Sequence, residues 1–272
     1  MNRYTQVFSK LKKRNEIAFV PFAVAGDPDP DLSLDILLSY VEGGADILEI
    51  GFPFSDPIAD GPVNQRASQR SIQGGMDYSR FFSIVKKLRQ KSDIPIGLLL
   101  YANSIHYLGY EKFCKEASEA GIDSMLVVDM PPEESSELSK TMTKYNIGKV
   151  FIVSELTPAK RMKYICSNVD SFVYIVSRLG ATGADTVFSS SIDMTIKKLR
   201  SETDKPLLAG FGISTPEHVR SIATAGADGA IVGSALVRIV EESVKKGENP
   251  CALIKEAVAA YKTGTLLNQR VL

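Results

Sequence analysis

Short apolar runs alternate with longer stretches of mixed apolar and polar residues along the whole chain. Nearly continuous apolar runs are typical of parallel strands that are covered on both faces. The predicted strands are residues 18–24, 46–51, 94–101, 124–129, 149–153, 171–177, 206–209 and 229–232. Strands that alternate with helices form a parallel sheet, and eight such units in 272 residues predict an α/β fold closed into a (β/α)8 TIM barrel.

Helical periodicity fills the segments between these strands. One helix face carries Leu34, Leu37, Leu38 and Val41. Asp29 followed by Pro30 is typical of a helix N-terminus. Asn249 and Pro250 open a final predicted helix in the same way. Residues 1–14 carry apolar side chains at helical spacing without the apolar core of a signal peptide, so we expect an extra N-terminal helix. Because no linker or low-complexity tract interrupts the chain, we predict one catalytic domain over residues 1–272.

The charge balance argues against several kinds of partner. Basic and acidic residues number 32 each, so the net charge favours neither nucleic acid nor an anionic membrane. No apolar run is long enough to span a membrane. Cys114, Cys166 and Cys251 are widely spaced, which predicts reduced thiols in a cytoplasm rather than a disulfide framework or a zinc site. The two histidines lie in separate segments, so we expect no metal site.

Glu49 is the first candidate for chemistry. It stands in a predicted strand between Leu48 and Ile50, close to the C-terminal strand ends where such barrels place their active sites. Burial there would raise the pKa of its carboxyl group toward neutrality, which suits proton transfer. A structural carboxylate that pairs with a buried backbone or lysine group is the alternative. The position near the active end of the barrel favours catalysis.

The loop that follows, "PFSDPIADGP", is too long and too restricted by proline for a simple connection. It offers two further carboxylates, Asp56 and Asp60. Aspartate before proline or glycine also forms turns, and for Asp56 alone a turn is the preferred interpretation. We therefore regard Asp60 as the stronger candidate.

Three glycine-rich segments, "SRLGATGAD", "GFGIS" and "VGSA", follow the last three predicted strands. Glycine lets backbone N–H groups approach an anion closely, and Ser234 is placed to begin a helix whose N-terminus favours negative charge. Together they predict a phosphate cradle, which is a recurring feature of this barrel. No lysine or arginine accompanies "GFGIS" or "VGSA", so we expect backbone groups and Ser234 to bind the phosphate, with Arg178 as the nearest cation.

Two kinds of aldolase are disfavoured. A Schiff-base enzyme needs a lysine at an inner strand end, but Lys205 precedes its strand and so lies at the opposite end. A metal-dependent enzyme needs clustered ligands, and the sequence offers none. The residues therefore predict proton-transfer chemistry on a phosphorylated substrate without a cofactor.

The chain resembles the tryptophan synthase alpha chains over essentially its whole length. The resemblance rests on "PFAVAGDPDP", "DILEIGFPFSDPIADGPVNQ", "IPIGLLLYAN", "YIVSRLGATG", "GFGIS" and "GADGAIVGSA", in this order and spacing. The second of these motifs is highly specific, and the glycine motifs are shared with other phosphate-binding barrels. Val24 is a departure, because many relatives have threonine there.

The resemblance implies a reverse aldol cleavage of indole-3-glycerol phosphate to indole and glyceraldehyde 3-phosphate. Glu49 would be the main acid/base residue, and Asp60 would bond to the indole N–H. The implied indole pocket consists of Phe22, Leu99, Tyr101, Leu126 and Phe211. Tyr174 and Thr182 match the sixth strand and its loop, and the implied phosphate cradle consists of Gly183, Gly212, Gly233 and Ser234.

The resemblance also implies a partner. Related alpha chains form an α2β2 complex in which indole passes to a beta chain that carries pyridoxal phosphate, so no cofactor is expected in this chain. Pro53, Asp56 and Pro57 match residues that lie against the beta chain. One alternative is a weakly catalytic chain that mainly activates its beta partner. Another is a different phosphosugar barrel, such as one in histidine biosynthesis, although "GLLLYAN" and "FSDPIADGP" argue against it.

Overall fold

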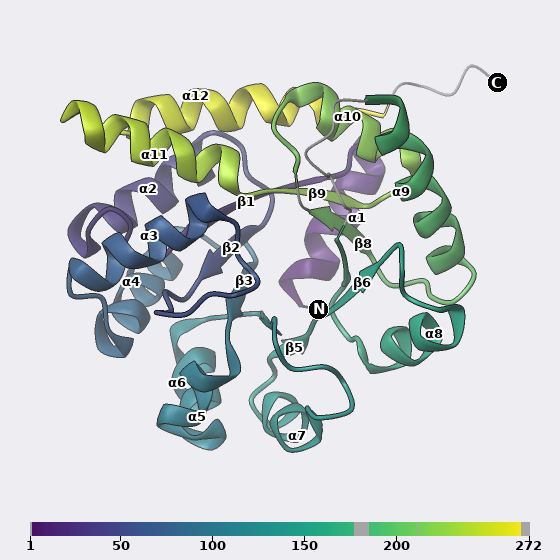
Figure 1. Ribbon diagram of the computed structural model, residues 1–272, viewed down its shortest axis with the longest axis horizontal. Helices are drawn as coiled ribbons and strands as arrows, with labels where there is room; N and C mark the ends of the chain where they lie inside the picture. Colours follow the sequence, from purple (N-terminus) through teal and green to yellow (C-terminus); the bar gives the residue numbers. More distant parts are fainter. Residues whose placement is uncertain (1, 177–184, 211, 268–272) are drawn as a thin grey trace.

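Every predicted strand forms in the structure, a computed structural model that describes residues 2–176, 185–210 and 212–267 (Figure 1). The strands are β1 (Ala18–Val24), β2 (Leu48–Gly51), β3 (Ile96–Leu100), β4 (Ser124–Val127), β5 (Gly148–Lys149), β6 (Phe151–Ser154), β7 (Val173–Val176), β8 (Leu207–Gly210) and β9 (Gly229–Val232). All pairings between these strands are parallel. The first and last strands have the predicted bounds, and the others are shorter by a few residues or shifted by one.

The predicted fifth strand is divided in two at Val150. The strand order is β5-β4-β3-β2-β1-β9-β8-β7-β6, so β5 and β6 are the two edges of one sheet. β5 pairs with β4, and β6 pairs with β7. Val150 still donates its backbone N–H to Met125 at 3.2 Å, so the chain changes partners within one residue. The sheet therefore closes through this bent strand, and the predicted (β/α)8 barrel is confirmed.

Helices surround the barrel. They are α1 (Arg3–Arg14), α2 (Pro30–Glu42), α3 (Pro62–Gln73), α4 (Tyr78–Lys91), α5 (Ala102–Leu108), α6 (Tyr110–Ala120), α7 (Ser136–Lys144), α8 (Ala159–Asn168), α9 (Asp185–Arg200), α10 (Pro216–Ala225), α11 (Ser234–Lys246) and α12 (Cys251–Lys262), with a short 3-10 turn at Thr263–Thr265. The predicted cap is confirmed, because the Asp29 side chain accepts from the N–H groups of Asp31 and Leu32. Asn249 accepts from the N–H of Cys251 at the start of the last helix.

The predicted N-terminal helix, α1, is confirmed, and it packs against the apolar interior of the barrel (Figure 1). Its Tyr4 and Leu11 side chains are buried in a cluster with interior residues from the strands, including Val20 and Leu208. The Tyr4 hydroxyl is 2.7 Å from the Ser124 hydroxyl, so its polar atom is hydrogen-bonded despite its burial. A larger apolar layer lies between the strands and the outer helices.

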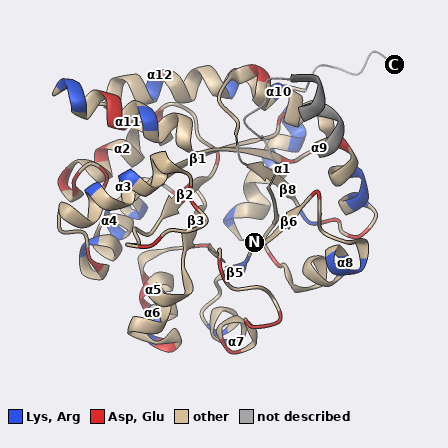
Figure 2. Ribbon diagram, viewed as in Figure 1, with Lys and Arg blue, Asp and Glu red and all other residues tan. Residues whose placement is uncertain are grey.

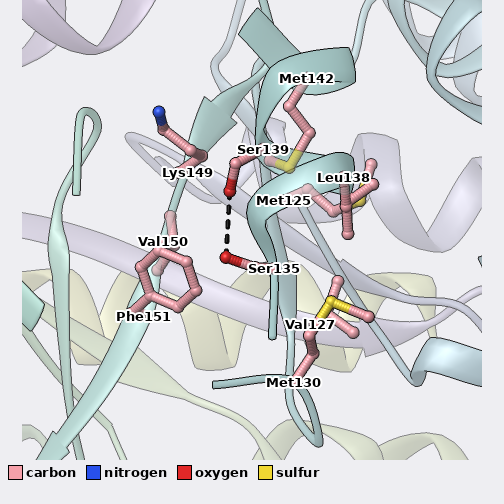
Figure 3. Close-up of a pocket in the computed structure, with 10 residues that line it drawn as sticks. All are labelled: Met125, Val127, Met130, Ser135, Leu138, Ser139, Met142, Lys149, Val150 and Phe151. Carbon is pink, nitrogen blue, oxygen red and sulfur yellow. Dashed lines mark hydrogen bonds between the residues drawn. The ribbon is translucent and has the colours of Figure 1, made fainter. Parts of the chain in front are cut away.

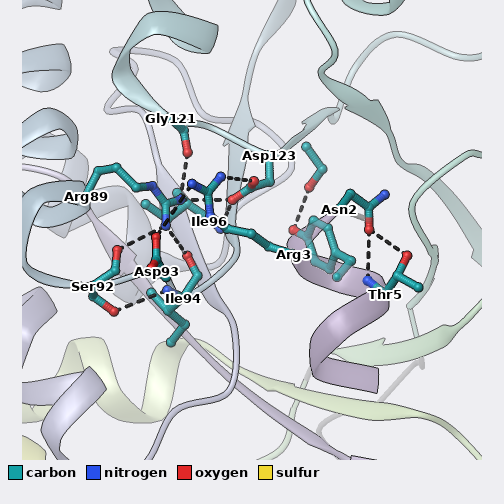
Figure 4. Close-up of polar contacts among 12 residues, drawn as sticks. Asn2, Arg3, Thr5, Arg89, Ser92, Asp93, Ile94, Ile96, Gly121 and Asp123 are labelled. Atoms are coloured by element: carbon teal, nitrogen blue, oxygen red, sulfur yellow. Dashed lines mark hydrogen bonds and ion pairs between the residues drawn. The ribbon is translucent and has the colours of Figure 1, made fainter. Parts of the chain in front are cut away.

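A carboxylate recurs at the N-terminal end of the barrel. In each of the repeated phrases "GADILEIG", "AGIDSMLVVD" and "AGADGAIVG", the aspartate accepts from a backbone N–H at the start of the preceding strand. The pairs are Asp46 with Phe19, Asp123 with Ile96 and Asp228 with Leu207, at 2.7–2.8 Å. Asp123 also binds Arg3 and Arg89 at 2.8 and 2.9 Å (Figure 4). The repeat therefore ties neighbouring strands together.

Charged positions lie mainly on the outer helices and the connecting loops, and the strands are mostly uncharged (Figure 2). Among the described residues, none of the helices combines the length and apolar character that crossing a membrane requires.

Candidate active site

A pocket of about 480 Å³ lies at the C-terminal ends of the strands. The predicted site residues that line it are Phe22, Glu49, Asp60, Leu99, Tyr101, Leu126, Tyr174, Gly212, Gly233 and Ser234. Ile152, Val176 and Ile231 add apolar surface from three other strand positions. The structure thus brings residues from distant parts of the sequence to one cavity with mainly apolar walls. Thr182, Gly183, Phe211 and Arg178, which the sequence also singled out, lie outside the described residues.

Glu49 is buried in this pocket, with 5% of its surface exposed. Its neighbours Leu48 and Ile50 belong to the outer apolar layer, so strand alternation directs Glu49 to the inside of the barrel. Burial raises the pKa of its carboxyl group to about 8, and the nearby Asp60 adds to the rise. No side chain of the described residues forms a hydrogen bond or an ion pair with it. It can therefore hold or release a proton near neutral pH.

Asp60 lies in the loop between β2 and α3, and Tyr101 holds it there. The Tyr101 hydroxyl donates to Asp60 Oδ2 at 2.9 Å and accepts from the Ala59 N–H at 3.1 Å. The Tyr101 ring stacks on Phe54 from the same loop, with ring centres 5.0 Å apart. Burial raises the pKa of Asp60, although its bonds to Tyr101 and Asn64 oppose the rise. The sequence had indicated Tyr101 only as a pocket wall.

Two strand-end glycines make room for aromatic rings that line the pocket. A Cβ atom at Gly51 would lie 2.8 Å from the Phe22 ring, and one at Gly210 would lie 2.5 Å from the Tyr174 hydroxyl. Both distances are too short for real contacts, so alanine at either position would displace a ring. Gly51 was not recognised from the sequence, because a glycine in an apolar strand does not reveal which ring lies opposite.

The remaining end of the pocket has the character of an anion site. Gly212 has a φ of +74°, a left-handed conformation that favours glycine. Gly233 caps α11, and Ser234 is its first residue, as predicted. Arg238, one turn further along α11, also lines the pocket. The turn "VGSA" itself contains no cation, but the four-residue spacing of a helix brings Arg238 to the Ser234 side.

The loop segment expected at a partner interface is only partly exposed. Pro53 and Pro57 are buried, whereas Asp56 is exposed and accepts from the Ser55 hydroxyl. Ile58, in the same loop, is 86% exposed. The loop is therefore anchored by its prolines and presents Asp56 and an apolar tip to solvent.

Two smaller cavities are poorer candidates. A void of about 10 Å³ beneath α7, with methionines among its walls, is at most large enough for one water molecule (Figure 3). Another, of about 260 Å³, lies around Asp129–Pro132 and shares Leu126, Val128 and Ile152 with the large pocket. No group of His, Cys, Asp or Glu side chains in the described parts of the chain is arranged to hold a metal ion.

The family model described as "Tryptophan synthase alpha chain" matches residues 8–265. The chain belongs to this family. It is similar to the tryptophan synthase alpha chain of Methanoregula boonei, with 46% identity over 244 residues, 90% of this chain and 91% of that one. A crystal structure of tryptophan synthase subunit alpha from Legionella pneumophila superposes with a TM-score of 0.89 and 32% identity, over 97% of this chain and 98% of that one.

A further solved structure, from Pyrococcus furiosus, is described as the basis of mutual activation of the tryptophan synthase α2β2 complex. Its matched chain superposes with a TM-score of 0.84 and 36% identity, over 91% of this chain and 98% of that one. The resemblance seen in the sequence motifs is thus confirmed as membership of the tryptophan synthase alpha chain family. The family is that of a lyase of tryptophan biosynthesis.

Proposed function

We propose that this chain cleaves indole-3-glycerol phosphate into indole and glyceraldehyde 3-phosphate by a reverse aldol reaction. The observation that carries the proposal is the pair of carboxyl groups, Glu49 and Asp60, in one largely apolar pocket with glycines and a cation at its other end. A volume of about 480 Å³ is ordinary for a small-molecule site. The apolar walls suit the indole ring, and the glycine-rich end suits the phosphate.

Glu49 carries the proton transfers in this proposal. Its carboxyl group, with a pKa of about 8, donates a proton to indole C3. The resulting carboxylate takes the proton from the side-chain hydroxyl on the carbon bonded to C3. The O–H electron pair forms the aldehyde C=O, and the C3–carbon bond breaks with its electron pair returning to the ring. Glu49 ends with the proton it began with, so the step balances without an external acid or base.

Asp60 stabilises the charge that develops between these two transfers. Protonation of C3 makes the ring an indoleninium cation, whose positive N–H is a strong hydrogen-bond donor. A carboxylate that Tyr101 and Asn64 already orient needs little rearrangement to accept this bond. The reaction therefore needs side chains of this chain alone, and pyridoxal phosphate belongs to the beta partner.

We propose that a beta chain binds over the same face of the barrel. Large apolar side chains are exposed there on three separate loops or helices, which is typical of a contact surface. They are Ile58, Tyr107 and Leu156, which are 86%, 79% and 64% exposed. Asp56 lies next to this surface, and the buried Pro53 and Pro57 shape the loop that presents it.

With its three cysteines free, the chain suits a reducing cytoplasm.

The test is the release of indole and glyceraldehyde 3-phosphate from synthetic substrate by the purified chain, alone and with beta chain from the same source. We expect both products in equal amounts in either case. Indole only in the presence of beta chain would favour a mainly activating role. Absence of both products under both conditions would overturn the proposal.

A further inference from the structure

One cation lining the pocket, Arg238, has no ion-pair partner in the part of the chain that the structure describes. Arg238 lies on α11 and is exposed, and no carboxylate among the described residues comes within ion-pair distance of it. Glu242, its neighbour at the i+4 position, does not pair with it either. Since no hydrogen bond or ion pair with another described residue uses the guanidinium group, its charge is free for a ligand.

The other arginines nearby are already engaged. Arg66 of α3 binds Glu241 through two bonds of 2.7 and 2.8 Å, and these hold the pKa of Glu241 down at about 2. Arg70 binds Asp27 through two bonds of 2.7 and 2.9 Å. Both arginines therefore fix α3 to its neighbours. Among the described residues that line the pocket, Arg238 is the one cation.

The charges inside the pocket favour such a cation at one end. A phosphate dianion is repelled by Glu49 and Asp60 whenever these are ionised, so it must sit at the opposite end. The N-terminus of α11 supplies backbone N–H groups and Ser234 there, but only partial positive charge. Ser234 and Arg238 are four residues apart in one helix and face the same side. A guanidinium group in this place completes an anion site.

We propose that Arg238 binds the phosphate of the substrate and sets the preference of the pocket for phosphorylated ligands. The proposal rests on the proposed function and adds a side-chain cation to the expected cradle of backbone groups and Ser234. Because the side chain is exposed and stabilises no other element, its loss should weaken ligand binding without unfolding the protein. Its contribution should also decrease with salt concentration, as expected for an accessible ion pair.

The test compares two ligands that differ only in the phosphate group, 3-(indol-3-yl)propyl phosphate and 3-(indol-3-yl)propanol, by calorimetry on the full chain. Arg238→Gln should weaken binding of the phosphate by about tenfold and leave the alcohol unchanged. Arg238→Lys should retain part of the phosphate preference, since it keeps the charge but not the two-pronged geometry. Lys246→Gln, which removes a charge from the far end of α11, should behave as wild type.

Equal binding of the phosphate by wild type and Arg238→Gln would overturn the proposal. Weakening of both ligands to the same extent would also overturn it, because it would show a structural effect. These outcomes differ from failure of the proposed function, in which wild type itself would release no indole and bind neither ligand. Indole release should show a matching increase in KM for Arg238→Gln with little change in kcat.

Discussion

Both ends of the barrel contain largely buried carboxylates, but the two ends differ in the hydrogen-bond donors that surround these groups. At the N-terminal end, Asp123 accepts from the Ile96 N–H, from Arg3 and from Arg89 (Figure 4). At the C-terminal end, Glu49 has no such donor among the described residues, and burial raises the pKa of its carboxyl group to about 8. The same chemical group is thus bound by three donors in one place and kept able to exchange a proton in the other.

This difference follows from what each carboxylate faces. A buried charge is stable when hydrogen bonds and opposite charges compensate for its lost hydration, and otherwise it favours the neutral form. Arg89 itself donates to the carbonyl groups of Ser92, Ile94 and Gly121, so Asp123 belongs to a hydrogen-bonded network at the N-terminal end. At the C-terminal end, Glu49 and Arg238 form no ion pair with any described residue, which leaves both available to substrate.

The largest expected effect comes from removing the exchangeable proton. Glu49→Gln keeps the size of the side chain but cannot transfer a proton, so the rate of indole release should fall by about 100-fold or more. Circular dichroism should show an unchanged fold. A folded variant with near-wild-type turnover would remove Glu49 from the mechanism and with it the functional contrast between the two ends.

Removal of the Asp123 carboxylate should instead affect stability. Asp123→Ala leaves the largely buried Arg89 without its counter-charge and the Ile96 N–H without its acceptor. We expect the free energy of unfolding to fall by about 2–3 kcal/mol in urea titrations, with kcat of the folded protein unchanged. Asp93→Ala is the matched control. The Asp93 side chain is 94% exposed, so its removal should change the free energy of unfolding by less than about 0.5 kcal/mol.

A pH series sharpens the comparison further. Glu49 begins the reaction as an acid, so kcat/KM should decline by about tenfold per pH unit above its pKa of about 8. In the unfolded chain its pKa returns to about 4.5, so unfolding releases a proton between these values. The free energy of unfolding should therefore decrease as pH rises through this window, and decrease less in Glu49→Gln. Identical pH profiles for the two proteins would contradict the raised pKa.

The smallest effect concerns the partner. We expect the beta chain to raise the rate of indole release by at least about tenfold, a coupling of roughly 1.4 kcal/mol, by closing the loop that carries Asp60. Asp56→Ala should reduce this activation while basal activity and fold stay the same. Asp93→Ala, which removes an aspartate from the opposite end of the barrel, should be activated like wild type. Titration of indole formation with beta chain measures the activation of wild type and of both variants. A wild-type rate that does not change on addition of beta chain would indicate a stand-alone lyase.

The sequence by itself determined the barrel and the main acid/base candidate. Strand and helix periodicity are local properties, so β1 and β9 could be predicted to the residue. A glutamate between Leu48 and Ile50 is anomalous within a few residues, because alternation must direct it into an apolar interior. The aspartates of the repeated phrases can also be found in the sequence, but the backbone N–H groups that they bind cannot.

Only the tertiary structure decided which polar groups meet. The bond from Tyr101 to Asp60 spans 41 residues, and the ion pair of Arg66 with Glu241 spans 175. Arg238 could not be assigned to the pocket from "VGSA" alone, since its position depends on the direction in which α11 leaves the barrel. The division of the fifth strand at Val150 likewise depends on closure of the whole sheet. Such features arise from contacts between distant segments, and local pattern carries no information about distances through space.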